Sequence, residues 1–482
     1  MSKGREPSGG STGTPLPPAG FRKGDTIELL IDSMAYGGRG IGRVNGCVIF
    51  VRGTVTGDRI SCRIVKKKKA YAEALLVELL APSPHRIEPP CPYAGYCGGC
   101  QWQHVVYEKQ LEFKREQVVE PLEHIGGLKN PLVHKVMPSE KVFEYRNKME
   151  FSFSDRRWYL PDEMHLREIH GDFALGLHVP GAFQKVIDME ACRLQQDTGN
   201  RILRDVKKYA QESGIPVYGL KSHEGFWRFL TLRYSVAFDE WMVNLITSEY
   251  RPETVQALSD FLCEKYDRIR TVVNNINVRK ASIAVGETEK TLAGDGFIED
   301  RIGDYHFRIS ANSFFQTNSV GAAALYEKVA EYAGLQGNET VLDLYSGTGT
   351  IPIFLSEKAD SVTGIEISES ATADAAKNAR ENHANNCRFI CGDMKDALKE
   401  ISFKPDVVII DPPRAGMHKD VMAMLLEMAP KKIVYISCNP TTLARDLGEM
   451  VGAYELHEVQ PVDMFPNTYH IEAVARLSLH LG

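Results

Sequence analysis

The sequence predicts an α/β protein: a doubly wound, Rossmann-like parallel sheet at the carboxyl end, preceded by a small β-barrel and a central α+β segment. Three observations support this prediction. From about residue 306, strand-like apolar runs alternate with helical stretches, as they do when crossover helices cover a parallel sheet. Residues 21–82 hold short strand-like runs separated by turns, which favour a small barrel. Residues 83–305 mix helical stretches with short alternating runs and open with closely spaced cysteines.

Composition limits the class of protein. The chain has 482 residues, 43% hydrophobic and 25% charged, which is typical of a globular protein with several domains. Its net charge of −6 means that any nucleic-acid surface is a local patch. No apolar run approaches the ~18 residues of a membrane span, and the amino terminus lacks the apolar core of a signal peptide. We therefore expect a cytoplasmic protein whose ten cysteines are free thiols, metal ligands or catalysts.

The amino-terminal region is expected to hold a disordered leader and then the barrel. Residues 1–20 are rich in Gly, Ser, Thr and Pro, a composition that does not form a packed core. Four strands are expected in the barrel of residues 21–82: Thr26–Ile31, Cys47–Val51, Arg59–Val65 and Tyr71–Leu80. Lys66–Lys69 follow the third run, where they fit a solvated loop and a phosphate contact equally well.

The two remaining regions differ in pattern. In residues 83–305 we expect helices near 107–122 and 196–213, and strands near 229–236 and 241–247 that form an antiparallel sheet. In residues 306–482 we expect a helix over 369–385. The strands of the parallel sheet are expected at Thr340–Leu344, Ser361–Glu366, Cys387–Cys391, Asp406–Ile410 and Lys432–Ser437.

Several polar groups follow these last strands and predict a nucleotide-type cofactor site. Ligands of such sheets bind at the carboxyl ends of the strands. Gly347 and Gly349 allow a tight turn, and Glu366 lies where a carboxylate can accept hydrogen bonds from ribose hydroxyls. Asp393 and Asp411 end two further strands. This pattern fits a dinucleotide or S-adenosyl-L-methionine, and the Asp-x-x-x-Gly-x-Gly form of the loop resembles the first motif of class I methyltransferases.

A second motif, Asp411-Pro412-Pro413-Arg414, resembles the acid-Pro-Pro turn of many nucleic-acid methyltransferases. Enzymes that methylate exocyclic amines place an aromatic residue after the prolines, to stack on the target base. Here Arg414 holds that position. The motif therefore argues against amine methylation. An amine or protein methyltransferase, which would not need Cys438, is the alternative enzyme class.

Cys438 and Glu472 are the predicted catalytic pair. Methylation of C5 in a uracil ring needs a thiolate that adds to C6 and a base that later removes the C5 proton. Cys438 follows a strand and precedes a helix, whose amino terminus favours the thiolate. The run 469–474 predicts a late strand with His470 and Glu472 on one face, and Glu472 is the expected base.

A group of cysteines opens the central region. Cys91, Cys97 and Cys100 form a C-x5-C-x2-C pattern with glycines between the last two. Three thiols at this spacing indicate chelation, and the spacing itself leaves zinc and an iron–sulfur cluster open.

Together these motifs resemble the RNA 5-methyluridine methyltransferases, in particular those of the 23S rRNA type that carry an OB-like TRAM barrel and an iron–sulfur cluster. The resemblance rests on Ser437–Pro440, Asp411–Arg414, His470–Glu472, Val341–Gly349 and the cysteine pattern. It implies Cys438 as nucleophile, Glu472 as proton acceptor and Cys192 as the fourth ligand of a [4Fe–4S] cluster. It also implies that S-adenosyl-L-methionine is held by Gln316, Tyr345, Gly347, Gly349, Glu366, Asp393 and Asp411.

RNA is the expected partner, and no obligate protein partner is inferred. The segments 145–148 and 227–233 interleave aromatic and basic residues, which suits RNA contacts; a solvated strand with one packed ring fits each segment at least as well. Large-subunit rRNA is the expected substrate on domain content, with tRNA as the alternative. A non-catalytic RNA-binding factor for ribosome assembly is the alternative of another class.

Overall fold

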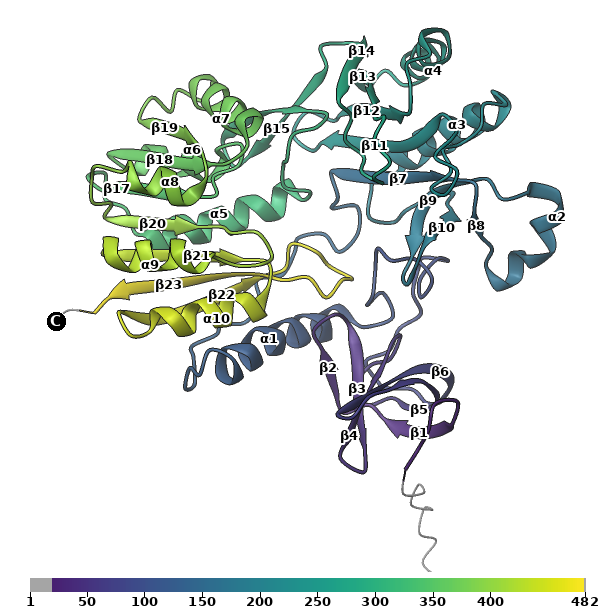
Figure 1. Cartoon of the computed structure of the whole chain (residues 1–482), viewed down its shortest axis with the longest axis horizontal. Helices are drawn as coiled ribbons and strands as arrows, with labels where there is room; N and C mark the ends of the chain where they lie inside the picture. The colour runs from purple at the N-terminus through teal and green to yellow at the C-terminus, as the bar shows by residue number, and fades with distance from the viewer. Residues whose placement is uncertain (1–19, 481–482) are drawn as a thin grey trace, which may run out of the picture. The chain divides into compact units, whose positions relative to one another are not determined.

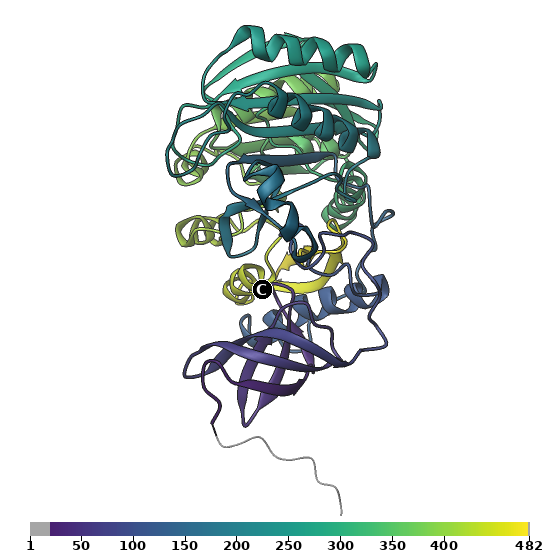
Figure 2. The same cartoon turned by 90° about the vertical axis from the view of Figure 1, so that its right-hand side faces the viewer.

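The computed structural model describes residues 20–480 (Figures 1 and 2), and the chain divides into two compact units, with the boundary in the sequence between Ile87 and Glu88. The predicted leader lies, except for Gly20, outside the described residues. Among residues 20–480, no helix combines the length and apolar character that crossing a membrane requires.

The amino-terminal unit is a six-stranded sheet in the order β1-β5-β6-β4-β3-β2. Its strands are β1 Thr26–Leu30, β2 Ser33–Ala35, β3 Arg39–Val44, β4 Cys47–Val51, β5 Arg59–Lys67 and β6 Tyr71–Ala81. The Asp32 amide donates to the Ile41 carbonyl at 2.8 Å, which joins the end of β1 to β3 and closes the sheet on itself. The four predicted strands are confirmed, apart from small differences at their ends.

Strands β2 and β3, the second of which contains Gly40 and Gly42, were not predicted. The structure gives these glycines a packing role. A Cβ at Gly40 would lie 2.1 Å from Thr54 Oγ1, and one at Gly42 would lie 2.5 Å from the Leu30 carbonyl oxygen. Glycine in this strand marks the close approach of neighbouring chain segments rather than a loop.

The predicted lysine loop is also partly strand. Lys66 and Lys67 end β5. Lys66 Nζ lies 2.9 Å from Glu73 Oε1, and Lys67 Nζ donates to the Phe21 carbonyl at 2.7 Å. These two lysines are therefore paired within their own unit.

The central part of the larger unit is an eight-stranded sheet in the order β14-β13-β12-β11-β7-β9-β10-β8. Its pairs are antiparallel except β12–β13 and β10–β8, so the predicted antiparallel sheet is mixed. Helices α3 (Asp197–Glu212) and α4 (Pro252–Lys265) contact each other and the sheet (Figures 1 and 2). The remaining elements are β7 Lys148–Ser154, β8 Arg157–Trp158, a 3-10 helix Pro161–Leu166, α2 Arg167–His170, β9 Ala174–Val179, β10 Ala182–Asp188, β11 Trp227–Ser235, β12 Glu240–Thr247, β13 Ile269–Ile276 and β14 Thr288–Ala293.

The segment that follows the cysteines packs away from the central sheet. Helix α1 (Tyr107–His124) lies against α10 (Pro440–Met450), as Figure 1 shows. Val133 and Met137 then form isolated bridges with Val459 and Val462. The helix itself was predicted, but its packing against the carboxyl-terminal sheet was not.

The carboxyl-terminal sheet has seven strands in the order β19-β18-β17-β20-β21-β23-β22. Successive side chains of its strand β21 are buried on opposite faces of the sheet. Val434 and Ile436 pack with residues of α5, whereas Ile433 and Tyr435 pack with residues of α10. Such burial on both faces is the physical basis of a doubly wound sheet. β23 runs antiparallel to both of its neighbours, so the predicted parallel sheet ends in an antiparallel edge.

The bounds of the predicted parallel strands agree closely with the structure. β17 Thr340–Leu344, β18 Ser361–Glu366, β19 Cys387–Cys391 and β21 Lys432–Ser437 are confirmed, and β20 is Val407–Ile410. The helix predicted to Asn385 ends at Glu381. The other elements are β15 Phe297–Ile302, β16 Tyr305–Ser310, α5 Ser319–Ala333, α6 Thr350–Leu355, a 3-10 helix Ser356–Lys358, α7 Glu369–Glu381, α8 Met394–Lys399, α9 Lys419–Met428, β22 Tyr454–Val462 and β23 Glu472–Leu479.

Candidate active site

The loop after β17 is shaped by three residues with left-handed backbone. Tyr345 has φ 69°, Gly347 φ 55° and Gly349 φ 79°. A Cβ at Gly349 would lie 2.8 Å from the Phe389 ring, so this glycine is required by packing. A Cβ at Gly347 would meet no described atom within 4 Å. The loop thus presents open backbone at Gly347, where a ligand can approach closely.

Glu366 is tied to this loop. Its Oε2 accepts the Gly347 amide at 3.0 Å, and its Oε1 accepts the Ser368 amide at 2.8 Å. The carboxylate at the end of β18 is therefore held beside the glycine turn, as a ribose-binding role requires.

Asp343 is a site residue that we did not single out from the sequence. Its side chain is buried, and both carboxylate oxygens lack a hydrogen-bond partner among residues 20–480. Burial, and then the charges of Asp411 and Glu366, raise its pKa well above the usual range. A buried carboxyl group with unused oxygens fits a ligand that brings donors or positive charge, which is the character of an amino-acid sulfonium. Its place as first residue of the Asp-x-x-x-Gly-x-Gly motif was the available signal.

The other predicted cofactor residues surround this loop. Burial raises the pKa of Asp411, after β20, to about 7. The Gln316 side chain bonds to Tyr326, whose hydroxyl lies 2.9 Å from Thr350 Oγ1 at the start of α6. Asp393 caps α8 by accepting the Lys395 amide at 3.0 Å. This capping bond gives Asp393 a structural role that the sequence did not reveal.

Cys438 and Glu472 face each other at the end of the sheet. β21 ends at Ser437, which pairs with Ala473 of β23. The same register continued by one residue puts Cys438 opposite Glu472, whose charge acts on the Cys438 thiol. His470 lies before β23, in a loop rather than in the predicted strand. The prediction that His470 and Glu472 share a strand face was therefore wrong.

The Arg414 loop is fastened to the start of α10. Asn439 caps that helix, and its Nδ2 donates to the Arg414 carbonyl at 2.9 Å. Thr442 Oγ1 donates to the same carbonyl at 3.3 Å. The Asp411–Arg414 turn is thus held next to Cys438.

Burial dominates the electrostatics of the pair. It raises the pKa of the Cys438 thiol to about 11, with the Glu472 charge adding to the rise and Arg414 opposing it. Burial and Asp411 raise the pKa of Glu472 well above its usual range, and Arg414 again opposes. The pKa of His470 falls to about 4 through burial and then the charge of Arg414. In the free protein, burial therefore outweighs the stabilisation of the Cys438 thiolate that we expected from the helix amino terminus.

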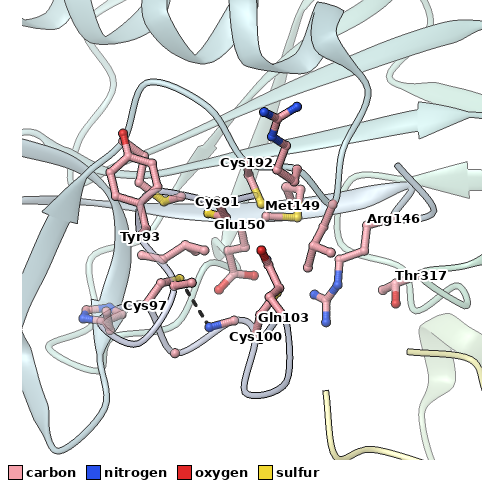
Figure 3. A pocket seen from close by; sticks show the side chains of 18 of the residues that line it. Cys91, Tyr93, Cys97, Cys100, Gln103, Arg146, Met149, Glu150, Cys192 and Thr317 are labelled. Carbon is pink, nitrogen blue, oxygen red and sulfur yellow. Dashed lines mark hydrogen bonds between the residues drawn. The ribbon is translucent and has the colours of Figure 1, made fainter. Parts of the chain in front are cut away.

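The four predicted metal ligands line one cavity of about 480 Å³, here called the thiol cavity: Cys91, Cys97, Cys100 and Cys192 (Figure 3). Thiol side chains from two distant parts of the chain surround it, a donor set that fits an iron–sulfur cluster. Among residues 20–480, however, no group of three or more His, Cys, Asp or Glu side chains is arranged to hold a metal ion. Metal binding therefore stays a prediction.

The basic residues of segment 227–233 are used inside the protein. Arg228 donates to the carbonyl oxygens of Asn277, Arg279 and Ala281, and Arg233 donates to those of Ala311 and Ser313. Both arginines are buried. The alternative of a solvated strand was wrong, because this segment is a packed strand, and its buried arginines do not support an RNA contact there.

Comparison with known proteins identifies two regions of the chain. A family model described as tRNA (uracil-5-)-methyltransferase matches residues 256–479, and a TRAM-domain model matches residues 20–77. An RNA methyltransferase of Chlorobaculum tepidum, described as uncharacterized, is 44% identical over 467 residues, covering 94% of this chain and 96% of its own. A similarly described protein of Bacteroides thetaiotaomicron is 41% identical, covering 92% of this chain and 100% of its own.

A solved structure agrees with these matches. The tRNA (uracil-54, C5)-methyltransferase of Pyrococcus abyssi, in complex with S-adenosyl-L-homocysteine, superposes with a TM-score of 0.73 at 31% identity. The match covers 94% of this chain and 100% of that one. With relatives this similar over nearly the whole length, and with a thiol opposite a carboxyl group beside a glycine-rich loop, the chain belongs to the RNA uracil-5-methyltransferase family.

Proposed function

We propose that the protein transfers a methyl group from S-adenosyl-L-methionine to C5 of a uridine in RNA, through a covalent bond between Cys438 and uracil C6. The observation that carries this proposal is the register of β21 and β23, which sets Cys438 opposite Glu472. This reaction needs both groups at one ring, the thiolate at C6 and the base at C5. An amine methyltransferase or a non-catalytic factor needs neither.

The chemical steps assign one role to each residue. Cys438 Sγ bonds to C6, and the electrons of the C5–C6 double bond move toward C5 as an enolate. C5 then bonds to the sulfonium methyl group of the methyl-donor substrate as the S–CH3 bond breaks, and the electron pair of that bond stays on sulfur, which leaves as a neutral thioether. Glu472 takes the C5 proton, the double bond re-forms, and Cys438 leaves as the thiolate. Arg414, whose charge lowers the pKa of both Cys438 and Glu472, favours the ionised forms that these steps require.

The methyl donor is assigned to the loop after β17. Glu366 would accept from the ribose, and Asp343 and Asp411 would face the charged end of the donor. The supporting observations are the bond from Gly347 to Glu366, the open space at Gly347 and the unpartnered Asp343 carboxyl group. Gln316, Tyr345, Gly349 and Asp393 complete the proposed site.

We assign a [4Fe–4S] cluster to Cys91, Cys97, Cys100 and Cys192, with zinc as the alternative. The shared thiol cavity supports the ligand set. Protein purified without oxygen should contain about four iron and four sulfide per chain, with the broad visible absorbance of such clusters. Stoichiometric zinc without sulfide would replace this assignment by the alternative.

The RNA substrate has two candidates. Large-subunit rRNA is proposed first, from the family resemblance. tRNA is the second candidate, because the similar archaeal structure is that of a tRNA enzyme. Residues 88–482 are 395 of the 482 residues, about 82%, so a match over 94% of the chain extends into the amino-terminal unit. Domain content alone therefore does not separate the two candidates. Mapping of 5-methyluridine in both RNAs from cells that lack the protein distinguishes them.

The decisive experiment traps the covalent bond. RNA that carries 5-fluorouridine cannot lose its C5 substituent as a proton, so the adduct should persist under denaturing electrophoresis. Wild-type protein and the control Cys263→Ala, which alters a cysteine of α4, should form it, and Cys438→Ala should not. Methylated product without any trapped adduct in the wild type would refute the covalent mechanism.

A further inference from the structure

The loop that delivers Glu472 is Asp463–Ile471, between β22 and β23. Asn467 lies at its centre, buried and with left-handed backbone at φ 65°. Four residues separate Asn467 from Glu472. The position of Asn467 therefore constrains the path by which the chain enters β23.

Segments far away in the sequence satisfy the hydrogen-bonding groups of Asn467. Its carbonyl oxygen accepts the amides of Gln101 and Trp102 at 2.9 and 3.0 Å. Its amide donates to Gln110 Oε1 at 2.9 Å, and its Nδ2 donates to the Val142 carbonyl at 2.7 Å. Asn467 is thus held by residues of the segment 101–142 rather than by β22 or β23.

The same segments form walls of the thiol cavity. Cys100 and Gln103 line the cavity, and the two residues between them hold Asn467 (Figure 3). A second connection repeats this arrangement. Arg146 lines the cavity and lies 5.9 Å from the centre of the Phe465 ring, while the Tyr145 hydroxyl donates to the Pro466 carbonyl at 3.0 Å. In each of these two short segments, one residue lines the thiol cavity and a neighbouring residue contacts the loop that leads to Glu472.

We propose that Asn467 is a positioning residue, through which the state of the thiol cavity sets the position of the Glu472 loop. When the four thiols hold their metal group, residues 100–103 and 145–146 are fixed, and the loop is fixed with them. When the group is lost, the donors to the Asn467 carbonyl move and Glu472 is displaced from the C5 proton. The proposal rests on the proposed function of Glu472.

This coupling predicts a specific kinetic lesion. Glu472 acts only after Cys438 has bonded to C6 and C5 has been methylated. Displacing Glu472 should therefore spare adduct formation and slow adduct breakdown. A general loss of folding or of RNA binding would instead reduce adduct formation.

The first test compares three variants on ordinary uridine RNA and on 5-fluorouridine RNA. Asn467→Ala removes the side-chain bonds to Val142 and Gln110 and strains the left-handed backbone, whereas Asn467→Gly removes these bonds alone. Asn277→Ala is the matched control: Asn277 is also buried, and its Nδ2 donates to a loop carbonyl, that of Ile283, in the central domain. We expect breakdown of the methylated adduct to slow about tenfold or more in Asn467→Ala, less in Asn467→Gly and not in Asn277→Ala.

The outcomes separate the coupling from the proposed function. If the wild type forms no adduct with 5-fluorouridine RNA, the proposed function itself fails. If the wild type forms it and Asn467→Ala turns over as fast as Asn277→Ala, the positioning role is overturned. Rescue of Asn467→Ala by the conservative Asn467→Gly supports a role of loop geometry, independent of overall stability.

The second test needs no activity measurement. Amide hydrogen exchange is followed by mass spectrometry before and after chelation of the metal group in the full-length protein. We expect faster exchange in peptides covering residues 463–472 together with residues 97–105, and unchanged exchange in α7. Increased exchange at 97–105 with an unchanged 463–472 peptide would refute the coupling.

Discussion

Lys114 Nζ and Asp463 Oδ1 form an ion pair of 2.5 Å in which neither side chain has solvent-exposed surface. Lys114 belongs to α1, and Asp463 opens the loop that leads to Glu472. Lys114 also donates to the Phe465 carbonyl at 3.0 Å, and Asp463 accepts the Tyr107 hydroxyl at 3.0 Å. The pair therefore joins α1 to the catalytic end of the carboxyl-terminal sheet.

Removal of the Lys114 charge should be strongly destabilising, because it leaves a buried carboxylate unpaired. We expect Lys114→Met to lower the free energy of unfolding by about 3–5 kcal/mol, measured by urea denaturation. The matched control is Lys431→Met, which breaks an exposed pair with Asp406 of 2.8 Å and should cost less than about 1 kcal/mol. Equal losses in the two variants would show that the buried pair has no special role.

Glu472→Gln should stop the reaction after methyl transfer. Glutamine keeps the size of the side chain but cannot accept the C5 proton, so the covalent RNA complex should accumulate while turnover falls by about 10²–10⁴-fold. Denaturing electrophoresis with ordinary uridine RNA measures this complex directly. Rapid release of unmodified RNA by the variant would assign the base to another residue.

Arg414→Ala should make Cys438 less reactive. The guanidinium opposes the rise in the pKa of Cys438, which stands at about 11 in the free protein, so its loss raises that pKa further. Each unit of increase lowers the thiolate fraction about tenfold at neutral pH. Peptide-resolved alkylation between pH 7 and pH 10 should show a slower reaction of Cys438 at every pH. Arg414→Lys keeps the charge and should retain most of the rate; equal slowing in both variants would point to packing instead.

Asp343 should make the free protein less stable as pH rises. Its folded-state pKa is raised above the unfolded value of about 3.9, so the folded state binds more protons than the unfolded state above about pH 4. Stability therefore falls with pH until the raised pKa is passed. Asp343→Asn should lose less thermal stability between pH 5 and pH 8 than the wild type or the exposed control Asp267→Asn. Asp411, with a pKa of about 7, acts in the same direction, so a part of the pH dependence should remain.

Local sequence patterns were sufficient where burial is continuous. β17, β18 and β21 have the predicted bounds because central parallel strands are apolar on both faces. Patterns misled where a residue type has two physical uses. Gly40 and Gly42 permit close packing inside a strand that the pattern did not reveal, and Arg228 satisfies buried carbonyl groups rather than phosphates.

The cysteine segment shows a second limit. Its spacing predicted that Cys91, Cys97 and Cys100 act together, and the structure adds Cys192 to the same cavity. Nothing in the spacing indicates that Gln101 and Trp102, between two cavity residues, bond to Asn467. Contacts across more than 350 residues are set by the packing of α1 and the following segment on the carboxyl-terminal sheet, and local patterns carry no information on them.

By itself the sequence determined the chemistry that is available: a thiol before a helix, a carboxyl group in the last motif, a glycine turn and a set of closely spaced thiols. The tertiary structure alone decided how these groups act on one another. Antiparallel pairing of β21 with β23 brings Cys438 opposite Glu472, and burial raises the pKa of both. The reason is physical: strand register and desolvation depend on the whole fold, whereas residue type and spacing are properties of the chain.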